Sequence, residues 1–175
     1  MPLHISSPFT PEAIQALRAG DEVLLSGVIY TGRDAAHKRM CALLDEGKPL
    51  PFDARGQAIY YAGPCPARPG RIIGAIGPTT SGRMDAYAPR LMEQGLLVMI
   101  GKGSRNAAVM EAIKKYGGVY LAAVGGAAAL MSKCVTAAEA VAFEDLGTEA
   151  VRRLIVENMP LIVAADCAGG DVYAK

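Results

Sequence analysis

The sequence predicts a single α/β domain with a mixed sheet flanked by helices. Runs of Val, Ile and Leu alternate with helical periodicities through the middle of the chain, which indicates strands connected by helices. Strand-like runs crowd both ends of the chain, so the sheet is expected to be mixed rather than purely parallel. No linker rich in Ser, Gly or Pro divides the sequence, and we therefore expect residues 1–175 to form one domain.

The first part of the chain is expected to form a short helix, a strand and a longer helix, at residues 11–20, 22–30 and 34–46. Thr10 is suited to cap the first helix, because its hydroxyl can accept a free N–H of the first turn and Pro11 fits the first helical position. In the longer helix, apolar residues recur at i, i+4, i+7 and i+8, which is the spacing of one helical face. Gly47 stands where a helix C-terminal glycine is usual.

The rest of the chain is expected to add several strands, two helices and a turn. The strands are expected at residues 57–62, 71–76, 96–100, 119–124, 139–144, 154–157 and 161–165. Apolar residues at i, i+4 and i+7 predict one helix over Asn106–Tyr116, and a second helix is expected after Ala86. Residues 125–130 form a segment of small side chains, and Ala168–Asp171 has the composition of a turn.

Composition and charge argue against nucleic acid and membranes as partners. The 18 Lys and Arg against 17 Asp and Glu give a formal net charge of +1, which is too low for a protein that mainly neutralises phosphates. Seven Tyr, three Phe and no Trp leave little aromatic surface for stacking bases. The longest apolar run, residues 122–131, is too short to span a bilayer, and the N-terminus lacks the features of a signal peptide. We expect a cytoplasmic protein.

The four cysteines do not have the spacing of a metal site. Cys41, Cys65, Cys134 and Cys167 are far apart, and no C-x-x-C motif occurs. Zinc-finger spacing and the spacing of a self-contained iron–sulfur site are therefore missing. We expect these thiols to be reduced and buried as small apolar groups, and we expect no metal to be bound by this chain alone.

Three cations recur in loops that follow predicted strands, each beside a glycine: Arg33, Arg83 and Lys102. In α/β sheets, ligands bind at the carboxyl ends of strands, where helix N-termini also present free N–H groups. Arginine offers a planar fork for a carboxylate and lysine a compact charge, so the three side chains are predicted to converge on one anion. The alternative is that they are solvated loop cations paired with acids such as Asp34 or Asp85.

The loop Gly77–Arg83 has the glycine spacing of a nucleotide P-loop but lacks its chemistry. Arg83 and Met84 stand where a P-loop has lysine and a magnesium-binding hydroxyl, and Pro78 removes one N–H. The loop suits a small oxyanion, with a structural turn as the alternative. His37 lies one turn into the predicted helix, and we favour a structural role over acid–base catalysis for it.

Residues 31–39, 77–85 and 100–103 carry three motifs in a specific order and spacing. Together they resemble the motifs of the iron–sulfur hydro-lyases, namely class I fumarases and L(+)-tartrate dehydratases, and the similarity includes residues 143–147 near the end of the chain. The similarity extends over nearly the whole chain and is to the β subunit, which is equivalent to the C-terminal domain of the single-chain enzymes.

The resemblance implies a swivelling β/β/α domain and the reversible anti addition of water to a dicarboxylate. It also implies a [4Fe-4S] cluster that three cysteines of the α subunit hold, with one open iron acting as a Lewis acid on the substrate. The cysteine spacing of this chain agrees, since the family does not require its β part to bind the cluster. The implied assembly is an αβ heterodimer or a dimer of αβ pairs.

Carried over by position, the resemblance makes Arg33 and Arg83 carboxylate-binding residues and Lys102 a third positive contact. Thr79 occupies the place of a threonine that takes part in proton transfer. Thr79 and Arg83 are thus the expected catalytic residues, in a β subunit of fumarate hydratase. One alternative is the β subunit of L(+)-tartrate dehydratase. An alternative of another class is a stand-alone anion-binding module without catalysis.

Overall fold

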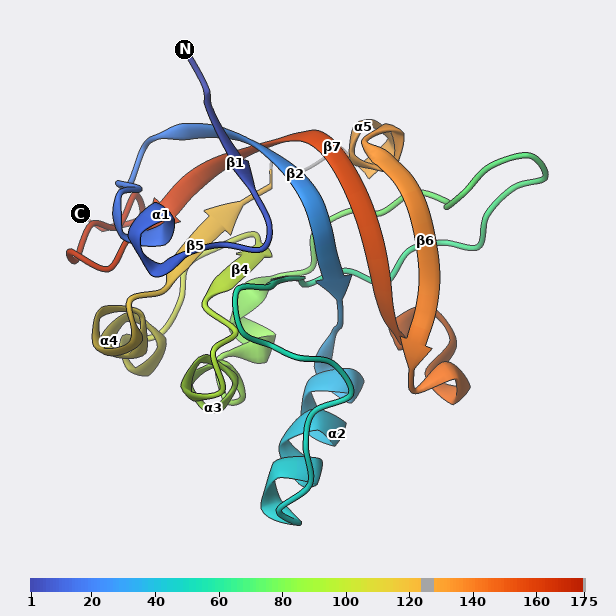
Figure 1. Cartoon of the computed structure of the whole chain (residues 1–175), viewed down its shortest axis with the longest axis horizontal. Helices are drawn as coiled ribbons and strands as arrows, with labels where there is room; N and C mark the ends of the chain where they lie inside the picture. Colours follow the sequence, from blue (N-terminus) through green and yellow to red (C-terminus); the bar gives the residue numbers. More distant parts are fainter. Residues whose placement is uncertain (124–127, 175) are drawn as a thin grey trace.

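The computed structural model describes residues 1–123 and 128–174 (Figure 1). Within these ranges the strands are β1 (Leu3–Ser6), β2 (Glu22–Thr31), β3 (Ala58–Tyr60), β4 (Val98–Gly101), β5 (Val119–Ala122), β6 (Val135–Ala142) and β7 (Val151–Ala165). The α-helices are α1 (Pro11–Gln15), α2 (Asp34–Asp45), α3 (Ala88–Glu93), α4 (Ala107–Tyr116) and α5 (Ala128–Lys133). Two short 3₁₀ helices, η1 (Ser81–Met84) and η2 (Glu144–Glu149), complete the described elements.

The sheet closes on itself. Its order is β1-β2-β3-β4-β5-β7-β6, and β2 pairs with β7 as well, so that β2, β3, β4, β5 and β7 form a ring. Strands β2 to β5 are parallel, whereas β7 is antiparallel to both β2 and β5. The predicted α/β class with a mixed sheet is therefore confirmed, in the form of a barrel-like sheet.

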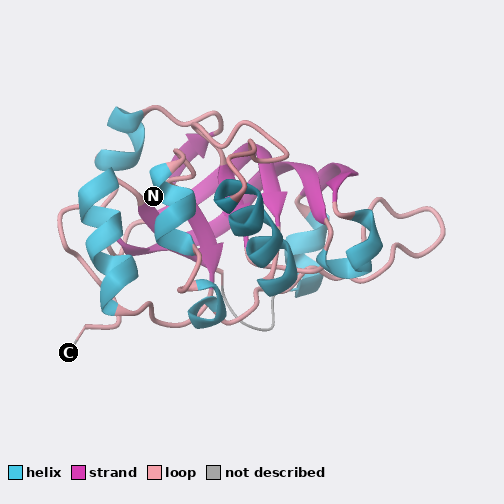
Figure 2. Cartoon of the chain, turned by 90° about the horizontal axis from the view of Figure 1, so that it is seen from below, coloured by secondary structure: helices cyan, strands magenta, loops and turns pink. Residues whose placement is uncertain are grey.

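Two apolar cores lie on the two faces of the ring strands. In β4, Val98 and Ile100 belong to one core and Met99 to the other, as the two-residue period of a strand requires. The first core takes side chains from all five ring strands and fills the ring. The second core joins the outer face to helices α2, α3 and α4, which Figure 2 shows lying over the sheet. None of the helices within the described ranges is long and apolar enough to cross a membrane.

The best-predicted elements are those with strong local signals. Strand β2 and helices α2 and α4 lie at the predicted positions. The Thr10 hydroxyl accepts the Ala13 N–H at 3.1 Å, so the predicted cap is confirmed, although α1 ends at Gln15 rather than near Gly20. Gly47 follows α2 with a φ of +70°, a left-handed conformation that favours glycine. Residues 168–171 turn as predicted, around the carboxylate of Asp166.

Several predicted elements are wrong, and the reason is the tertiary pairing. Residues 71–76 form no strand, because β3 and β4 pair directly with each other and leave no edge between them. They belong instead to a long segment, residues 62–79, which projects from the barrel in Figure 1 and is called the 62–79 loop below. The two C-terminal strands are one strand, β7, and β6 begins earlier than predicted. Strand β1, which includes His4, was not predicted. Residues 124–127 of the predicted strand and small-residue segment lie outside the described residues.

Candidate functional site

Three loops meet at the carboxyl ends of β2, β3 and β4. The Gly32 N–H donates to the Tyr60 carbonyl at 3.1 Å, which joins the end of β2 to β3. The Thr79 N–H donates to the Tyr61 carbonyl at 2.7 Å, and the Ser81 N–H donates to the Lys102 carbonyl at 2.8 Å. The loop with Thr79 thus reaches this edge through hydrogen bonds, although no strand leads into it. The three predicted cation loops lie side by side.

Arg33 occupies the N-cap position of α2 and is half-buried. A Cβ atom at Gly63 would lie 3.0 Å from the Arg33 Cδ and Nη1 atoms, so this glycine makes room for the side chain. The Arg33 Nε atom lies 3.9 Å from a carboxylate oxygen of Glu149 and, although it is buried, makes no hydrogen bond to any residue that the structure describes. A buried donor without a partner carries a free-energy cost, which a bound acceptor would remove.

Arg83 is paired with Asp34, the residue that follows Arg33. Its Nη2 atom lies 2.6 Å from Asp34 Oδ2, and its side chain is 56% exposed. Arg83 is therefore a loop cation paired with an acid, as the alternative prediction stated. Because that acid is Asp34, the ion pair also places Arg83 beside the start of α2. A guanidinium has five N–H donors, so a single carboxylate contact leaves donors for a ligand.

Lys102 and Thr79 complete the set of predicted site residues. Lys102 follows β4, is exposed, and forms a parallel bridge with Thr80. It makes no ion pair with another residue in the described ranges. Thr79 is half-buried, and its hydroxyl makes no hydrogen bond to any residue that the structure describes. No described base therefore activates the Thr79 hydroxyl.

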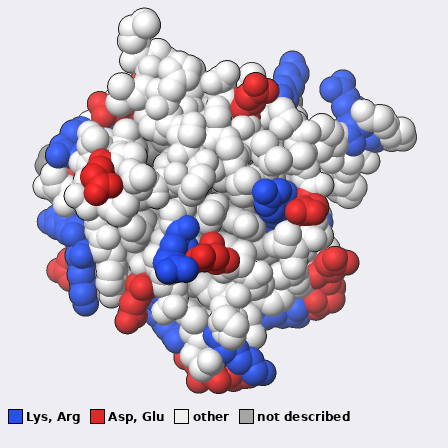
Figure 3. All heavy atoms as spheres, viewed as in Figure 1, with Lys and Arg blue, Asp and Glu red and all other residues white. Residues whose placement is uncertain are grey.

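Charge on the face seen in Figure 3 is dispersed. Positive and negative side chains alternate there, and uncharged atoms separate them. This face therefore presents no broad field of one sign.

Sequence reasoning missed a buried arginine beneath these loops. The side chain of Arg105 is 1% exposed and forms a 2.7 Å ion pair with Asp85. Its Nη2 atom donates to the Tyr61 hydroxyl at 3.1 Å, and its guanidinium lies over the rings of Tyr61 and Tyr120, at 5.1 and 4.7 Å from their centroids. Arg105 comes two residues after Gly103, where only its proximity to the Lys102 loop distinguishes it from a surface cation.

His37 is fully buried, and its ring is bonded to the backbone of Arg33. Its Nδ1 atom lies 2.8 Å from the Arg33 carbonyl, which accepts, so Nδ1 carries the proton. Burial lowers the pKa of His37 to about 4; the hydrogen bond to Arg33 opposes this shift, the charge of Arg105 adds to it, and that of Asp34 opposes it. The ring packs edge-on against Tyr61. A neutral histidine with a donating Nδ1 fits the predicted structural role.

This buried histidine predicts a pH dependence of stability. The folded pKa lies below that of the unfolded chain, so the unfolded chain takes up the proton first as the pH falls from about 6.5 to 4. We expect His37 to contribute about 3 kcal/mol to the loss of unfolding free energy between pH 7.5 and 4. His37→Gln removes this contribution. Urea unfolding of both proteins across this range measures it, and parallel curves would contradict the assignment.

A family model described as "Fumarase C-terminus" matches residues 2–175. The chain belongs to this family. The resemblance inferred from the motifs is therefore confirmed.

Relatives of this fumarase C-terminus domain carry two kinds of name. "Fumarate hydratase class I, aerobic" of Escherichia coli (strain K12) is 40% identical over 153 residues, which are 86% of this chain and 28% of that protein. "Fumarate hydratase 1, mitochondrial" of Leishmania major is 40% identical over 170 residues, which are 94% of this chain and 31% of that protein. "Putative L(+)-tartrate dehydratase subunit beta" of Methanocaldococcus jannaschii is 39% identical over 172 residues, which are 95% of this chain and 88% of that protein. The chain thus spans about three tenths of the fumarate hydratases.

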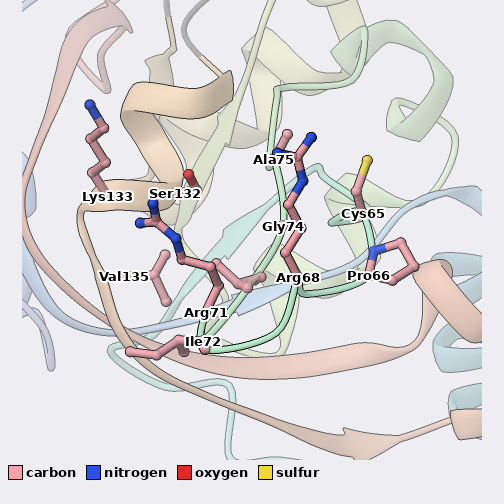
Figure 4. A pocket seen from close by; sticks show the side chains of 12 residues that line it. Cys65, Pro66, Arg68, Arg71, Ile72, Gly74, Ala75, Ser132, Lys133 and Val135 are labelled. Carbon is pink, nitrogen blue, oxygen red and sulfur yellow. The ribbon is translucent and has the colours of Figure 1, made fainter.

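Three cavities of the fumarase C-terminus domain are not lined by the predicted cations. A cavity of about 650 Å³ lies between the 62–79 loop and the junction of α5 and β6 (Figure 4). Neither this cavity nor the described cavities of about 400 and 470 Å³ are lined by Arg33, Arg83 or Lys102. At this edge of the barrel Arg83 and Lys102 are exposed, and Arg33 is half-buried.

The cysteines of the fumarase C-terminus domain do not fit a metal cluster. All four are free, and no three His, Cys, Asp or Glu residues gather at one point in the described ranges. The expectation that all four are buried is wrong. Cys41 is buried, Cys134 and Cys167 are half-buried, and Cys65 is exposed because it lies on the 62–79 loop. Burial raises the pKa of the Cys41 and Cys134 thiols, which keeps them protonated.

Proposed function

We propose that this domain is the β subunit of a two-subunit [4Fe-4S] hydro-lyase that converts fumarate and water reversibly into (S)-malate. The observation that carries the proposal is the placement of Arg33, Arg83 and Lys102 at one edge of the sheet, with Arg83 held beside Arg33 by Asp34. The names of the fumarate hydratases at about 40% identity support it. The partner is an α subunit, in an αβ heterodimer or a dimer of αβ pairs, and the setting is the cytoplasm.

In this proposal the three cations bind the dicarboxylate and stabilise the charge that develops on it. Arg33 and Arg83 bind carboxylates through their N–H groups, and the unpartnered Arg33 Nε atom is one such donor. Removal of a proton next to a carboxylate makes the transition state more negative than the ground state. Fixed cations stabilise that state more strongly, which raises the rate rather than only the affinity.

Thr79 moves the proton in this proposal, with help from the partner. A neutral hydroxyl is a weak base, and no described residue contacts the Thr79 hydroxyl to activate it. The α subunit must therefore supply the activating group. The barrel of residues 1–175 would approach the α subunit as one swivelling β/β/α domain and bring this edge to the substrate.

We assign the [4Fe-4S] cluster to the α subunit, because the residues of this chain do not fit it. Carboxylate binding by Arg33, Arg83 and Lys102 does not depend on any cluster ligand from this chain.

Anaerobic co-expression with the α subunit, followed by assays on fumarate, malate and both tartrates, tests the proposal. We expect turnover of fumarate and malate by the complex, iron only in the complex, and neither turnover nor iron in the chain alone. Turnover of none of these substrates would refute the hydro-lyase assignment and favour an anion-binding module. Stoichiometric iron on the isolated chain would refute the assignment of the cluster to the α subunit.

The second candidate is L(+)-tartrate dehydratase. It is favoured by the relative from Methanocaldococcus jannaschii, since the match covers 88% of a protein named as a subunit beta. Tartrate differs from malate by one hydroxyl. A higher kcat/KM for L(+)-tartrate than for malate in the same assays would select this candidate.

A further inference from the structure

Two of the three site loops, the one that carries Thr79 and Arg83 and the one that carries Lys102, pack on one buried guanidinium. Arg105 lies below the site. Its Nη1 atom contacts the Met99 Sδ atom of β4 at 3.5 Å. Its other partners are Asp85, through the ion pair, and Tyr61 and Tyr120, whose rings face the guanidinium, and each of these three residues in turn contacts a site loop. Its side chain, at 1% exposure, is too deeply buried to touch a substrate at the exposed edge.

Tyr61 connects Arg105 to Thr79. The Arg105 Nη2 atom donates to the Tyr61 hydroxyl, and the Tyr61 carbonyl accepts the Thr79 N–H at 2.7 Å. Arg105 and Thr79 are therefore both hydrogen-bonded to Tyr61, Arg105 at the side chain and Thr79 at the backbone.

Tyr120 and Asp85 connect Arg105 to the part of the same loop that carries Arg83 and to the Lys102 loop. The Tyr120 hydroxyl donates to the Gly103 carbonyl at 2.7 Å and accepts from the Ser81 hydroxyl at 2.7 Å, so it joins the loops of Lys102 and Arg83. Asp85 lies two residues after Arg83, and its Oδ2 atom accepts the Asn106 N–H at 2.9 Å. The same two loops are thus joined a second time.

We propose that Arg105 is a positioning residue. Through Tyr61, Asp85 and Tyr120, it holds the loop of Thr79 and Arg83 and the loop of Lys102 in fixed positions relative to each other. A lysine at this position keeps the charge but not the planar fork that contacts Asp85 and the Tyr61 hydroxyl together. Arg105→Lys is therefore expected to fold, while the loop of Thr79 and Arg83 and the loop of Lys102 lose their fixed positions relative to each other.

Amide hydrogen exchange, followed by NMR on the full chain, tests directly how firmly the loops are held. In Arg105→Lys we expect the amides of Thr79, Ser81 and Asn106 to exchange at least about 10-fold faster, with the β2–β7 ladder unchanged. Arg55→Lys is the matched control, because Arg55 pairs with Asp53 at the surface, 82% exposed. Unchanged exchange at the three amides, or equal acceleration throughout the barrel, would overturn the proposal.

The kinetic consequence rests on the proposed function and uses the assembled αβ enzyme. Misplacement of Thr79 and the cations is expected to lower kcat/KM of Arg105→Lys about 100-fold, with Arg55→Lys unchanged. A wild-type value in Arg105→Lys would overturn the positioning role. If the wild-type complex turns over no substrate, the proposed function fails, and the exchange experiment alone decides whether Arg105 holds the loops.

Discussion

Replacing Arg83 with alanine is expected to lower kcat of the assembled enzyme by about 100- to 1,000-fold. The reason is that a fixed cation next to the developing charge contributes more to the transition state than to the bound substrate. The side chain is largely exposed, so its loss should leave the fold intact, which circular dichroism can verify. Steady-state kinetics on fumarate and malate measure the effect.

The split between kcat and KM decides the role of Arg83. A higher KM with an unchanged kcat would mean that Arg83 contributes equally to ground state and transition state, contrary to the proposal. Arg90→Ala is the matched control, since Arg90 of helix α3 forms a surface ion pair of similar length with Asp45, at 2.7 Å. That variant is expected to keep wild-type kinetics.

Replacing Asp85 with alanine is expected to lower the free energy of unfolding by about 3–5 kcal/mol, because it leaves the Arg105 guanidinium buried without a counter-ion. The Asn106 N–H also loses its acceptor. Urea unfolding of the isolated chain measures the loss.

Two comparisons make the Asp85 result specific. Asp53→Ala breaks a surface pair with Arg55 and is expected to leave stability nearly unchanged. The double variant Asp85→Ala/Arg105→Met removes both charges, so it should lose less than Asp85→Ala alone. If Asp85→Ala is as stable as Asp53→Ala, the buried pair does not support the loops as described.

The parts of the fold that could be predicted from the sequence are those decided by neighbours in the chain. Thr10, Gly47 and the periodicity of α2 act within a few residues, and the structure contains all three features. The strand predicted at residues 71–76 failed because strand formation needs an open sheet edge, and β3 and β4 leave none. Closure of the sheet could likewise not be predicted from the sequence, since it depends on pairing between β2 and β7, which are far apart in the chain.

The same division applies to the candidate site. The glycine beside each of Arg33, Arg83 and Lys102 marked three loops, and the structure brings those loops to one edge. The pairing of Arg83 with Asp34 and the burial of Arg105 depend on how the loops pack, which spacing along the chain does not encode. The sequence alone does not distinguish a buried arginine from an exposed one.

Closure of the ring by β7 has a consequence for how this protein is made. Thr31 pairs with Arg152, so β2 leaves the ribosome long before the strand that will cover its edge. Until residues 151–165 emerge, the edges of β2 and β5 remain open to pairing with other chains. Contacts between such distant segments also slow folding. A nascent chain interrupted before Val151 should therefore aggregate. Chaperones and proteases must act on the chain before residues 151–165 have emerged.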